Sequence, residues 1–281
     1  MSTSASTAPD PLSEDDRPFR HYSLRHRIIA WLSCTFFDSF AYTARHGLLK
    51  GMKRKGGLGF VPELFVRGES AETQFWRRYD LEGLVAYDVG AFQGLLTLFF
   101  SRRAQHVVAY EPHPANFERL CENLRLNGVE NVTVRRLGLG AHPGRARLLW
   151  EPLMLGGATC DPQLIGGSPD KRSCHAEEIL ISTLDSDIET FGLPRPNLIK
   201  IDVEGFELEV LRGALVTLRR DHPALFLEMH GATLRQKRHK AAEMLEFLAT
   251  TGYREILHVE SGRMLTAAEA AFAYEGHLYC R

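Results

Sequence analysis

The chain has 281 residues, of which 44% are hydrophobic and 25% are charged, and its formal net charge is −1. This composition is ordinary for a soluble globular protein, and the near-neutral charge gives no reason to expect a nucleic-acid partner. The five cysteines form no C-x-x-C pair, which argues against a zinc ribbon and predicts a reducing compartment, so we expect a cytoplasmic protein.

The N-terminal part divides into two predicted regions. Residues 1–18 are rich in Ser, Thr, Pro and acidic side chains, which predicts a disordered tail, and we expect residues 19–80 to form a basic, mostly helical extension. Residues 17–55 carry nine Lys and Arg against Asp38 alone. This charge is either a solvated face or a patch for phosphate, an acidic glycan or the anionic inner face of a membrane.

From residue 84 onward, short apolar runs alternate with amphipathic stretches, which predicts a parallel sheet with crossover helices in a domain of residues 81–281. The predicted strands are Leu84–Val89, Val107–Tyr110, Val132–Leu137, Leu198–Val203, Ala224–Met229, Arg254–Val259 and His277–Cys280. The predicted helices are Leu95–Ala104, Pro114–Leu126, Glu207–Arg219, Thr233–Thr250 and Ala267–Phe272. Residues 150–178 have many glycines and prolines and no clear period, which predicts a long loop that serves as a lid or binding segment.

The first predicted strand runs into the stretch Y-D-V-G-A-F-Q-G. Gly90 permits a tight turn and a close approach of a ligand, as in many nucleotide-binding folds. Phe92 and the carboxylate of Asp88 do not suit a pyrophosphate, and Asp88 would suit a cationic group such as an amino group or a sulfonium. Glu111 ends the next strand, where an acid can accept both ribose hydroxyls. These features favour S-adenosylmethionine over NAD as the ligand.

The strand N-L-I-K-I-D-V-E-G places Lys200, Asp202 and Glu204 two residues apart, so the three project to one face at the carboxyl end of the sheet. The next strand ends in E-M-H, with Glu228 and His230 two apart. Asp202, Glu228 and His230 could bind a divalent metal, or His230 could act as a general base. The alternative is a structural pair of Lys200 with Asp202.

The ordered set D-V-G-A-F-Q-G-L-L-T, Y-E-P-H-P-A-N-F-E-R-L, S-T-L-D, I-K-I-D-V-E-G-F-E and P-A-L-F-L-E-M-H, over residues 84–231, resembles the FkbM-type family of S-adenosylmethionine-dependent methyltransferases. The resemblance implies a class I methyltransferase fold, which is Rossmann-like, with a seven-stranded, mostly parallel sheet and helices on both faces, and implies O-methylation of a hydroxyl of a sugar, glycolipid or other natural product. The acceptor would be a small molecule or a group linked to a glycan or lipid.

The resemblance also assigns residues to roles. Asp88, Gly90, Ala91, Gly94 and Glu111 would hold the methyl donor, and Gly138 and Leu139 would flank its adenine. Asp202 and Glu204 match the family's I-D-V-E-G element, and Glu228 matches its carboxylate after the next strand. Together with His230, the possible general base named above, they are the candidate catalytic residues. The family usually has Asn at the positions of Phe92 and His113.

Two other functions fit parts of the pattern. A catalytically inactive nucleoside-binding module in a glycan or natural-product pathway would keep the donor residues without methyl transfer. An NAD-dependent oxidoreductase would need a phosphate cradle, which Asp88 and Phe92 disfavour.

Overall fold

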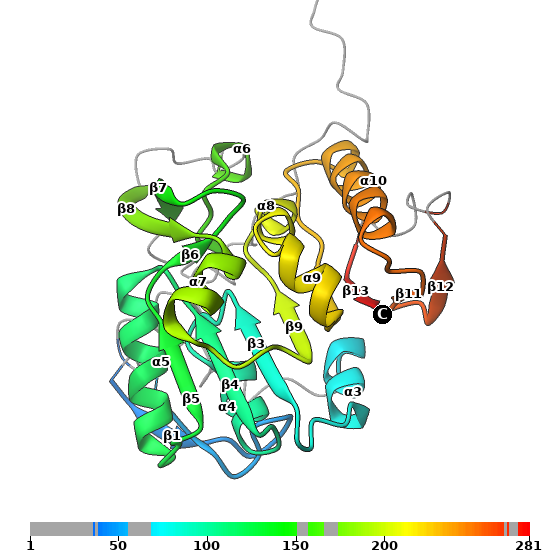
Figure 1. Cartoon of the computed structure of the whole chain (residues 1–281). Helices are drawn as coiled ribbons and strands as arrows, with labels where there is room; N and C mark the ends of the chain where they lie inside the picture. Colours follow the sequence, from blue (N-terminus) through cyan, green and yellow to red (C-terminus); the bar gives the residue numbers. More distant parts are fainter. Residues whose placement is uncertain are drawn as a thin grey trace, which may run out of the picture.

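Figure 1 shows the computed structural model of the chain, an α/β fold built on one large twisted sheet. The structure describes residues 36, 39–55, 69–150, 157–165, 174–266, 269 and 275–281. The predicted disordered tail lies outside the described residues, and so does most of the predicted helix Ala267–Phe272.

Eight strands form the main sheet, in the order β12-β11-β13-β10-β9-β3-β4-β5. The five strands from β10 to β5 pair in parallel, and β13 runs antiparallel to both of its neighbours. Their bounds are β3 Val85–Val89, β4 His106–Tyr110, β5 Val132–Arg135, β9 Leu198–Ile201, β10 Ala224–Glu228, β11 Ile256–His258, β12 Arg263–Leu265 and β13 His277–Cys280.

All seven predicted strands are present, and the mostly parallel α/β sheet is confirmed. The predicted number of strands in this sheet is corrected to eight. The chain turns back after β11 through Gly262, whose φ of 66° suits a tight turn, and β12 then pairs with β11.

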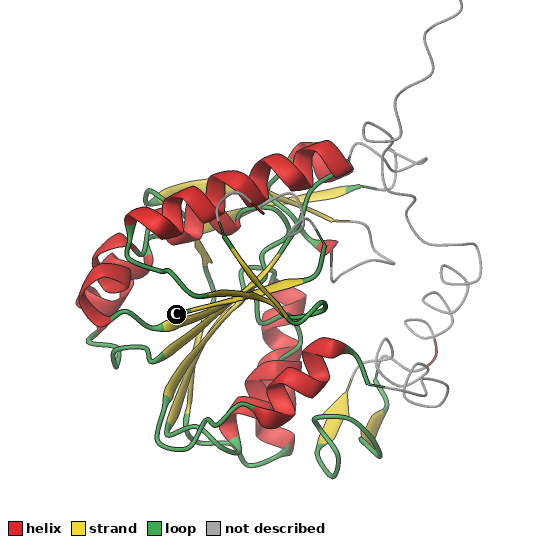
Figure 2. Cartoon of the chain, turned by 90° about the vertical axis from the view of Figure 1, so that its right-hand side faces the viewer, coloured by secondary structure: helices red, strands yellow, loops and turns green. Residues whose placement is uncertain are grey.

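Helices cover both faces of the sheet, as Figure 2 shows. Their bounds are α3 Ala71–Arg78, α4 Leu95–Ser101, α5 Pro114–Leu126, α6 Pro162–Ile165, α7 Leu184–Phe191, α8 Glu207–Arg212, α9 Leu215–Asp221 and α10 Leu234–Thr250. Tyr87 and Ile199 pack with α7, α8, α9 and α10, whereas their neighbours Ala86 and Leu198 pack with α3, α4 and α5. Alternate residues of each central strand therefore serve two hydrophobic cores.

The predicted helix Glu207–Arg219 is two helices. The backbone at Gly213, between the two helices, packs directly against the backbone of Gly140, just after β6. A Cβ atom at position 213 would lie 2.0 Å from the carbonyl oxygen of Gly140, so this position has no room for a side chain. The carboxylate of Asp185 accepts hydrogen bonds from the backbone N–H groups of Val216 and Thr217 at 2.8 Å and restarts the helix as α9.

A second sheet was not predicted. It has three strands in the order β6-β8-β7, with bounds β6 Gly138–Leu139, β7 Gly144–Trp150 and β8 His175–Ser182. The prediction of a loop over residues 150–178 is wrong at both ends, because Trp150 belongs to β7 and residues 175–178 belong to β8, and α6 lies between them. All of β7 pairs with β8, antiparallel, from Gly144 with Ile181 to Trp150 with His175. This small sheet lies above the carboxyl ends of the main strands (Figure 1), so it covers the edge where ligands bind in open α/β folds.

The described part of residues 19–80 contains a two-stranded sheet and α3. The strands are β1 Ala41–Thr43 and β2 Lys53–Lys55. Asn123 of α5 and Asn127, just after α5, accept hydrogen bonds from the backbone of β2. Of the basic residues in this part, Arg54 is buried and Lys55 pairs with Glu122. Among the described residues, no helix combines the length and the apolar character that a membrane crossing requires.

Candidate active site

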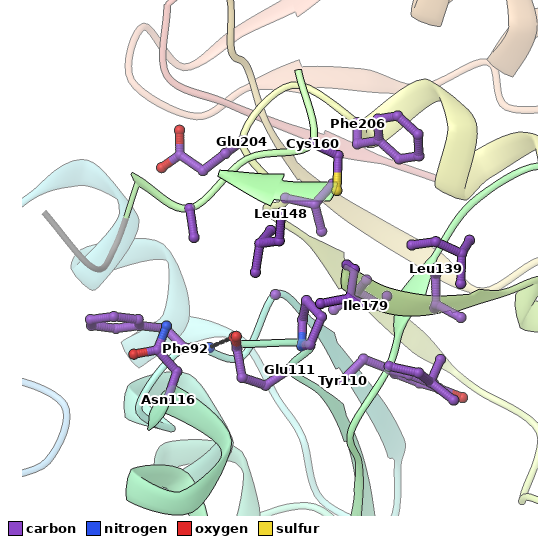
Figure 3. A pocket seen from close by; sticks show the side chains of 18 of the residues that line it. Phe92, Tyr110, Glu111, Asn116, Leu139, Leu148, Cys160, Ile179, Glu204 and Phe206 are labelled. Atoms are coloured by element: carbon purple, nitrogen blue, oxygen red, sulfur yellow. Dashed lines mark hydrogen bonds between the residues drawn. The ribbon is translucent and has the colours of Figure 1, made fainter. Parts of the chain in front are cut away.

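A cavity of about 260 Å³ lies between the carboxyl ends of β3, β4 and β9 and the three-stranded sheet (Figure 3). Four of the residues predicted to hold the cofactor line it, namely Gly90, Glu111, Gly138 and Leu139. The other three, Asp88, Ala91 and Gly94, are not among the lining residues and shape the turn behind the cavity. Asp202 and Glu204, predicted as catalytic, also line it.

The turn between β3 and α4 is held against two neighbouring strands. The backbone N–H groups of Gly90 and Ala91 both donate to the carbonyl oxygen of Tyr110, at 3.0 and 2.9 Å. Gly90 has a φ of +79°, and a Cβ atom there would lie 1.8 Å from the carbonyl oxygen of Asp202. Only glycine fits this position, because the turn touches the backbone beyond β9.

Asp88 is fully buried under this turn. Its Oδ2 accepts a hydrogen bond from the Thr97 hydroxyl at 2.5 Å, and its Oδ1 lies 3.4 Å from Nζ of Lys200. The Lys200 ammonium also donates to the carbonyl oxygen of Gly90 at 3.1 Å. The cationic group expected beside Asp88 is therefore a lysine of the same chain, and the pair holds the turn in place.

Glu111 projects into the cavity and is almost fully buried. Its two carboxylate oxygens accept hydrogen bonds from the backbone N–H groups of Phe92 at 2.7 Å and His113 at 2.8 Å. Burial raises the pKa of Glu111 to about 7, although these N–H groups favour the ionised form. These two hydrogen bonds fix the orientation of the Glu111 carboxylate, which can also accept hydrogen bonds from two neighbouring hydroxyls of a ligand.

The opposite wall of the cavity is apolar and was missed by sequence reasoning. It includes Leu148 of β7, Ile179 and Ile181 of β8, and Phe206 just before α8. A slot with apolar walls suits a flat ring such as adenine. The signal in the sequence was the alternation in H-A-E-E-I-L-I-S, which is typical of a strand with one covered face.

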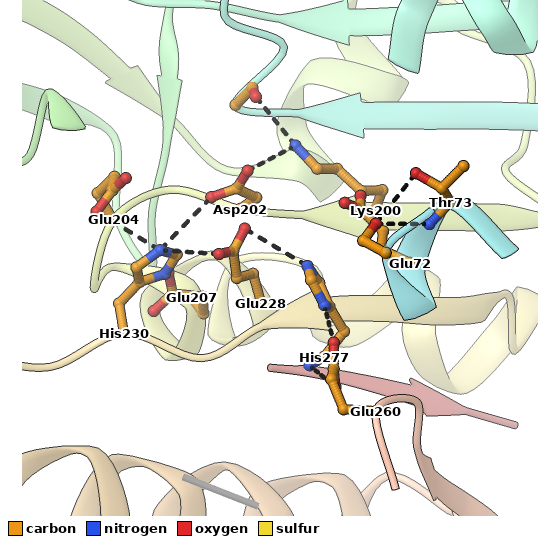
Figure 4. Close-up of polar contacts among 12 residues, drawn as sticks. Glu72, Thr73, Lys200, Asp202, Glu204, Glu207, Glu228, His230, Glu260 and His277 are labelled. Carbon is orange, nitrogen blue, oxygen red and sulfur yellow. Dashed lines mark hydrogen bonds and ion pairs between the residues drawn. The ribbon is translucent and has the colours of Figure 1, made fainter. Parts of the chain in front are cut away.

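The four predicted catalytic residues come together at the ends of β9 and β10 (Figure 4). His230 is at their centre, and its Nε2 lies 3.8 Å from Oδ1 of Asp202, 3.5 Å from Oε2 of Glu204 and 3.6 Å from Oε1 of Glu228. We call these four residues the acidic cluster. Asp202 and Glu204 belong both to this cluster and to the cavity wall, so the two sites are continuous.

Glu207 was not predicted as a site residue, yet it positions the imidazole. Its Oε1 lies 2.8 Å from Nδ1 of His230 and accepts a hydrogen bond from the backbone N–H of Gly205 at 2.9 Å. Glu207 is the first residue of α8 and is buried. Its position at a helix start suggested only a role in that helix.

The surroundings of the acidic cluster shift the pKa values of its titratable groups to different extents and in different directions. Burial lowers the pKa of His230, but Glu207 and the other carboxylates outweigh burial and raise it to about 10. Burial raises the pKa of Glu204 to about 7. Burial also opposes the charge on Asp202, yet Lys200 at 3.2 Å from its carboxylate and His230 hold its pKa below the ordinary value. The site therefore carries both a cationic group and several carboxylates near neutral pH.

A second histidine, His277, contacts the cluster through Glu228. Nε2 of His277 lies 3.7 Å from Glu228, and its Nδ1 lies 2.6 Å from Oε1 of Glu260. Burial lowers the pKa of His277, but hydrogen bonds to Glu228 and Glu260 raise it to about 9. His277 is in the last predicted strand, where nothing in the local sequence indicated a site.

Donor atoms of Asp202, Glu228 and His230, the predicted metal candidates, all lie within 4.8 Å of one another. Two carboxylates and one imidazole are an acceptable donor set for a divalent cation. The residues therefore come together as predicted.

The family described as the methyltransferase FkbM domain matches residues 88–255, more than half of the chain. "Methyltransferase 1" of Beauveria bassiana is 31% identical over 140 residues, which cover 45% of this chain and 56% of that protein. The "Hexuronic acid methyltransferase AglP" of Haloferax volcanii is 32% identical over 151 residues, which cover 53% of this chain and 57% of that protein.

The chain thus spans little more than half of the length of these curated relatives. Among solved structures, the methyltransferase FkbM from Methylobacillus flagellatus KT aligns with a TM-score of 0.48 and 19% identity, over 76% of this chain and 48% of that one. The family match covers both the donor-side turn and the strands that carry the acidic cluster. The chain belongs to the FkbM methyltransferase domain family.

Proposed function

We propose that the protein is an S-adenosylmethionine-dependent methyltransferase that O-methylates a hydroxyl of a sugar, a glycolipid or another natural product. The observation that carries the proposal is the continuity of the two sites. Glu111 stands in a cavity with an apolar slot, and Asp202 and Glu204 connect that cavity to the acidic cluster. A donor and an acceptor can therefore meet at the shared wall.

The donor would lie across the carboxyl ends of β3, β4 and β9. Glu111 would accept hydrogen bonds from the two ribose hydroxyls, and the adenine would enter the slot beside Leu139 and Ile179. Gly90 lines the cavity without a side chain, so the donor can approach the backbone of the turn. No pyrophosphate is needed in this arrangement, which favours a nucleoside over a dinucleotide.

The reaction would be a direct displacement. The acceptor oxygen attacks the methyl carbon of the sulfonium, the new C–O bond forms as the S–C bond breaks, and neutral S-adenosylhomocysteine leaves. The hydroxyl proton passes to the acidic cluster. Asp202 and Glu204 are the candidate acceptors there, because His230, with a pKa of about 10, already carries a proton near neutral pH and could accept one only in its neutral form. Because charge is neutralised in the transition state, enclosure and alignment supply much of the rate gain.

The acceptor class is supported by the comparison and by the site. One relative is named as a hexuronic acid methyltransferase, which makes a sugar hydroxyl a reasonable acceptor for this chain. A sugar hydroxyl is a weak nucleophile, and a cluster rich in carboxylates supplies groups that can take its proton. Peripheral contact of residues 17–55 with an anionic membrane surface stays a prediction, because most of that segment lies outside the described residues.

The test is calorimetric titration with S-adenosylmethionine, S-adenosylhomocysteine and NAD. We expect binding of the first two, and a loss of at least about tenfold in affinity in Glu111→Ala, because two ribose hydrogen bonds to a charged acceptor are removed. Glu130→Ala is the matched control, since Glu130 is an exposed glutamate away from the cavity. Binding of NAD alone would refute the proposal.

Transfer itself is then measured with a labelled methyl donor and a panel of neutral sugars, uronic acids and glycolipids, with the product mapped by mass spectrometry. Methylation at oxygen supports the proposal. Donor binding without transfer to any acceptor of the panel would favour the catalytically inactive nucleoside-binding module.

A further inference from the structure

We infer that Asp202, Glu228 and His230 bind a divalent cation of the Mn²⁺ class, at which the hydroxyl of the acceptor is held. The binding site itself follows from the contacts described above. Its catalytic role rests on the proposed function, since the cation would act on the acceptor of the methyl group.

The positions of the donor atoms are the first argument. They come from the ends of two adjacent parallel strands, β9 and β10, and Nε2 of His230 lies 3.8 Å from the Asp202 carboxylate and 3.6 Å from the Glu228 carboxylate. Ligands about 2.1 Å from one ion are at most about 4.2 Å apart. Both distances fall below that limit, and all three donor atoms lie within 4.8 Å of one another, so one ion can contact them after side-chain movements of about 1 Å or less.

The distances also leave room between the side chains. Three carboxylates face the same imidazole nitrogen, and none is within ordinary hydrogen-bonding distance of it, since the nearest, Glu204, is 3.5 Å away. A histidine that served only as a structural partner would be expected to make a short hydrogen bond from this nitrogen. An ion among these atoms would bring all of them to ligand distance.

The orientation of His230 is the second and separate argument. Glu207 contacts Nδ1 at 2.8 Å and is itself fixed by the backbone N–H of Gly205. Because Nδ1 is hydrogen-bonded to Glu207, the nitrogen that a neutral His230 would offer to an ion is Nε2, which faces Asp202 and Glu228, and the ion would take the place of the proton there. Metal-binding histidines are commonly held in this way by a carboxylate that is not itself a ligand.

The balance of charge favours a cation as well. Four carboxylates surround His230, those of Asp202, Glu204, Glu207 and Glu228. Two further cationic groups next to the cluster are shared with other carboxylates: Lys200 with Asp88, and His277 with Glu260. A divalent ion would offset this excess of negative charge.

The donor set selects the class of ion. Two carboxylates and one imidazole, without a thiolate, suit Mn²⁺ better than Ca²⁺, which prefers six to eight oxygen ligands. The side chains of Asp202 and Glu228 are 29% and 36% exposed, so water or an acceptor oxygen can reach the remaining coordination positions. Such an ion would lower the pKa of a bound hydroxyl and orient its oxygen toward the donor cavity, whose wall includes Asp202.

The experiment measures Mn²⁺ binding by the loss of the free-ion signal in electron paramagnetic resonance, with the full chain and no donor. We expect one ion per chain, and binding at least tenfold weaker in Glu228→Gln and in His230→Gln. Glu207→Gln should weaken binding by about 10- to 100-fold, because it releases the imidazole without removing a ligand. Glu246→Gln, a change at an exposed glutamate of α10, should leave Mn²⁺ affinity unchanged. Circular dichroism confirms that each variant is folded.

Calorimetry with S-adenosylmethionine is run on the same samples, which separates this inference from the proposed function. Glu228 and Glu207 do not line the donor cavity, so their variants should bind the donor as the unaltered chain does. Donor binding without Mn²⁺ binding, or Mn²⁺ binding that none of the three variants weakens, overturns the cation site and leaves the proposed function standing. Mn²⁺ binding at the cluster without donor binding supports the site and refutes the proposed function.

Discussion

Two residues at the edge of the donor cavity, Phe92 and Glu204, have a left-handed backbone with a φ of 52°. This conformation costs a non-glycine residue about 1–2 kcal/mol, and asparagine tolerates it best after glycine. Both positions are in turns that follow strand ends and line the cavity. Backbone strain is often found at ligand sites, where the surrounding structure holds the conformation in place.

We predict that Phe92→Asn raises the free energy of unfolding by about 0.5–1 kcal/mol, because asparagine relieves the left-handed strain. Phe92→Ala is the control, since it removes the same ring but keeps a side chain that disfavours this φ. Urea denaturation of both variants makes the comparison. Equal stability of the two variants would mean that the backbone conformation contributes nothing at this position.

The raised pKa of Glu111 allows a prediction of how donor affinity depends on pH. Its pKa in the free protein is raised to about 7 by burial, and only the ionised carboxylate can accept hydrogen bonds from both ribose hydroxyls. Donor affinity should therefore be full above pH 8 and fall as the pH drops through 7, by about tenfold between pH 8 and pH 6. Calorimetry across this range measures the effect.

The control for this pH dependence is Glu111→Gln, which cannot ionise at position 111. We expect its donor affinity to be weaker at high pH and nearly independent of pH, apart from the titration of the donor itself. A variant that keeps the same slope as the unaltered chain would show that another group is responsible.

Residues with a role in the site could be predicted where the sequence placed them at strand ends. Glu111, Asp202, Glu228 and His230 lie at or within two residues of the end of an apolar strand, and parallel strands bring such ends together. Glu207 and His277 could not be found in this way. Their roles depend on which atoms face His230 and Glu228 in space, and the pattern of neither segment encodes that.

At the scale of elements, the contact between the β3–α4 turn and the end of β9 sets the shape of the donor cavity. We predict that Gly90→Ala costs at least about 3 kcal/mol of stability and abolishes donor binding, because its Cβ would overlap the carbonyl oxygen of Asp202. Gly128→Ala is the matched control. Gly128 has a φ of +61° with nothing within 4 Å of an added Cβ, so it should cost only about 1 kcal/mol.

Thermal unfolding and donor titration of the two glycine variants test this contact. Similar losses of stability would show that the left-handed conformation matters at Gly90 and the backbone contact does not.

The elements of the main sheet were predictable, whereas those of the small sheet were not. The central strands are apolar on both faces and are separated by helices, a pattern that specifies a parallel sheet. β7 and β8 carry charged residues on their exposed face, and a glycine- and proline-rich segment separates them. Their pairing is a long-range contact, which local periodicity does not reveal. The break between α8 and α9 was hidden for the same reason, because its cause is the distant backbone of Gly140.

At the scale of the whole molecule, α3 joins the N-terminal part to the core. The sequence-based division at residue 81 placed this helix in the extension, but Trp76 is fully buried and its ring lies 4.4 Å from that of Phe226 and 4.9 Å from that of Phe100. Glu72 of α3 accepts a hydrogen bond from Trp76 and lies beside His277 and Lys200 near the acidic cluster (Figure 4). Residues before 81 therefore contribute to the methyltransferase core.

We predict that Trp76→Ala lowers the free energy of unfolding by about 3–5 kcal/mol, the usual cost of removing a large buried aromatic side chain. Leu180→Ala is the control, since Leu180 is 57% exposed and its removal should cost less than about 0.5 kcal/mol. Chemical denaturation measures both. A small effect at Trp76 would mean that α3 is a separate appendage.

The place of β13 in the sheet has a consequence for synthesis on the ribosome. It is the last of the eight strands in chain order, yet it lies between β10 and β11 and hydrogen-bonds to both. Until residues 277–280 have left the exit tunnel, β10 presents an unpaired edge, and β11 has no strand to join it to the sheet. The nascent chain can assemble the donor half early, but the half that carries Glu228 is completed only after β13 has been made, and its open edge can pair with other strands until then.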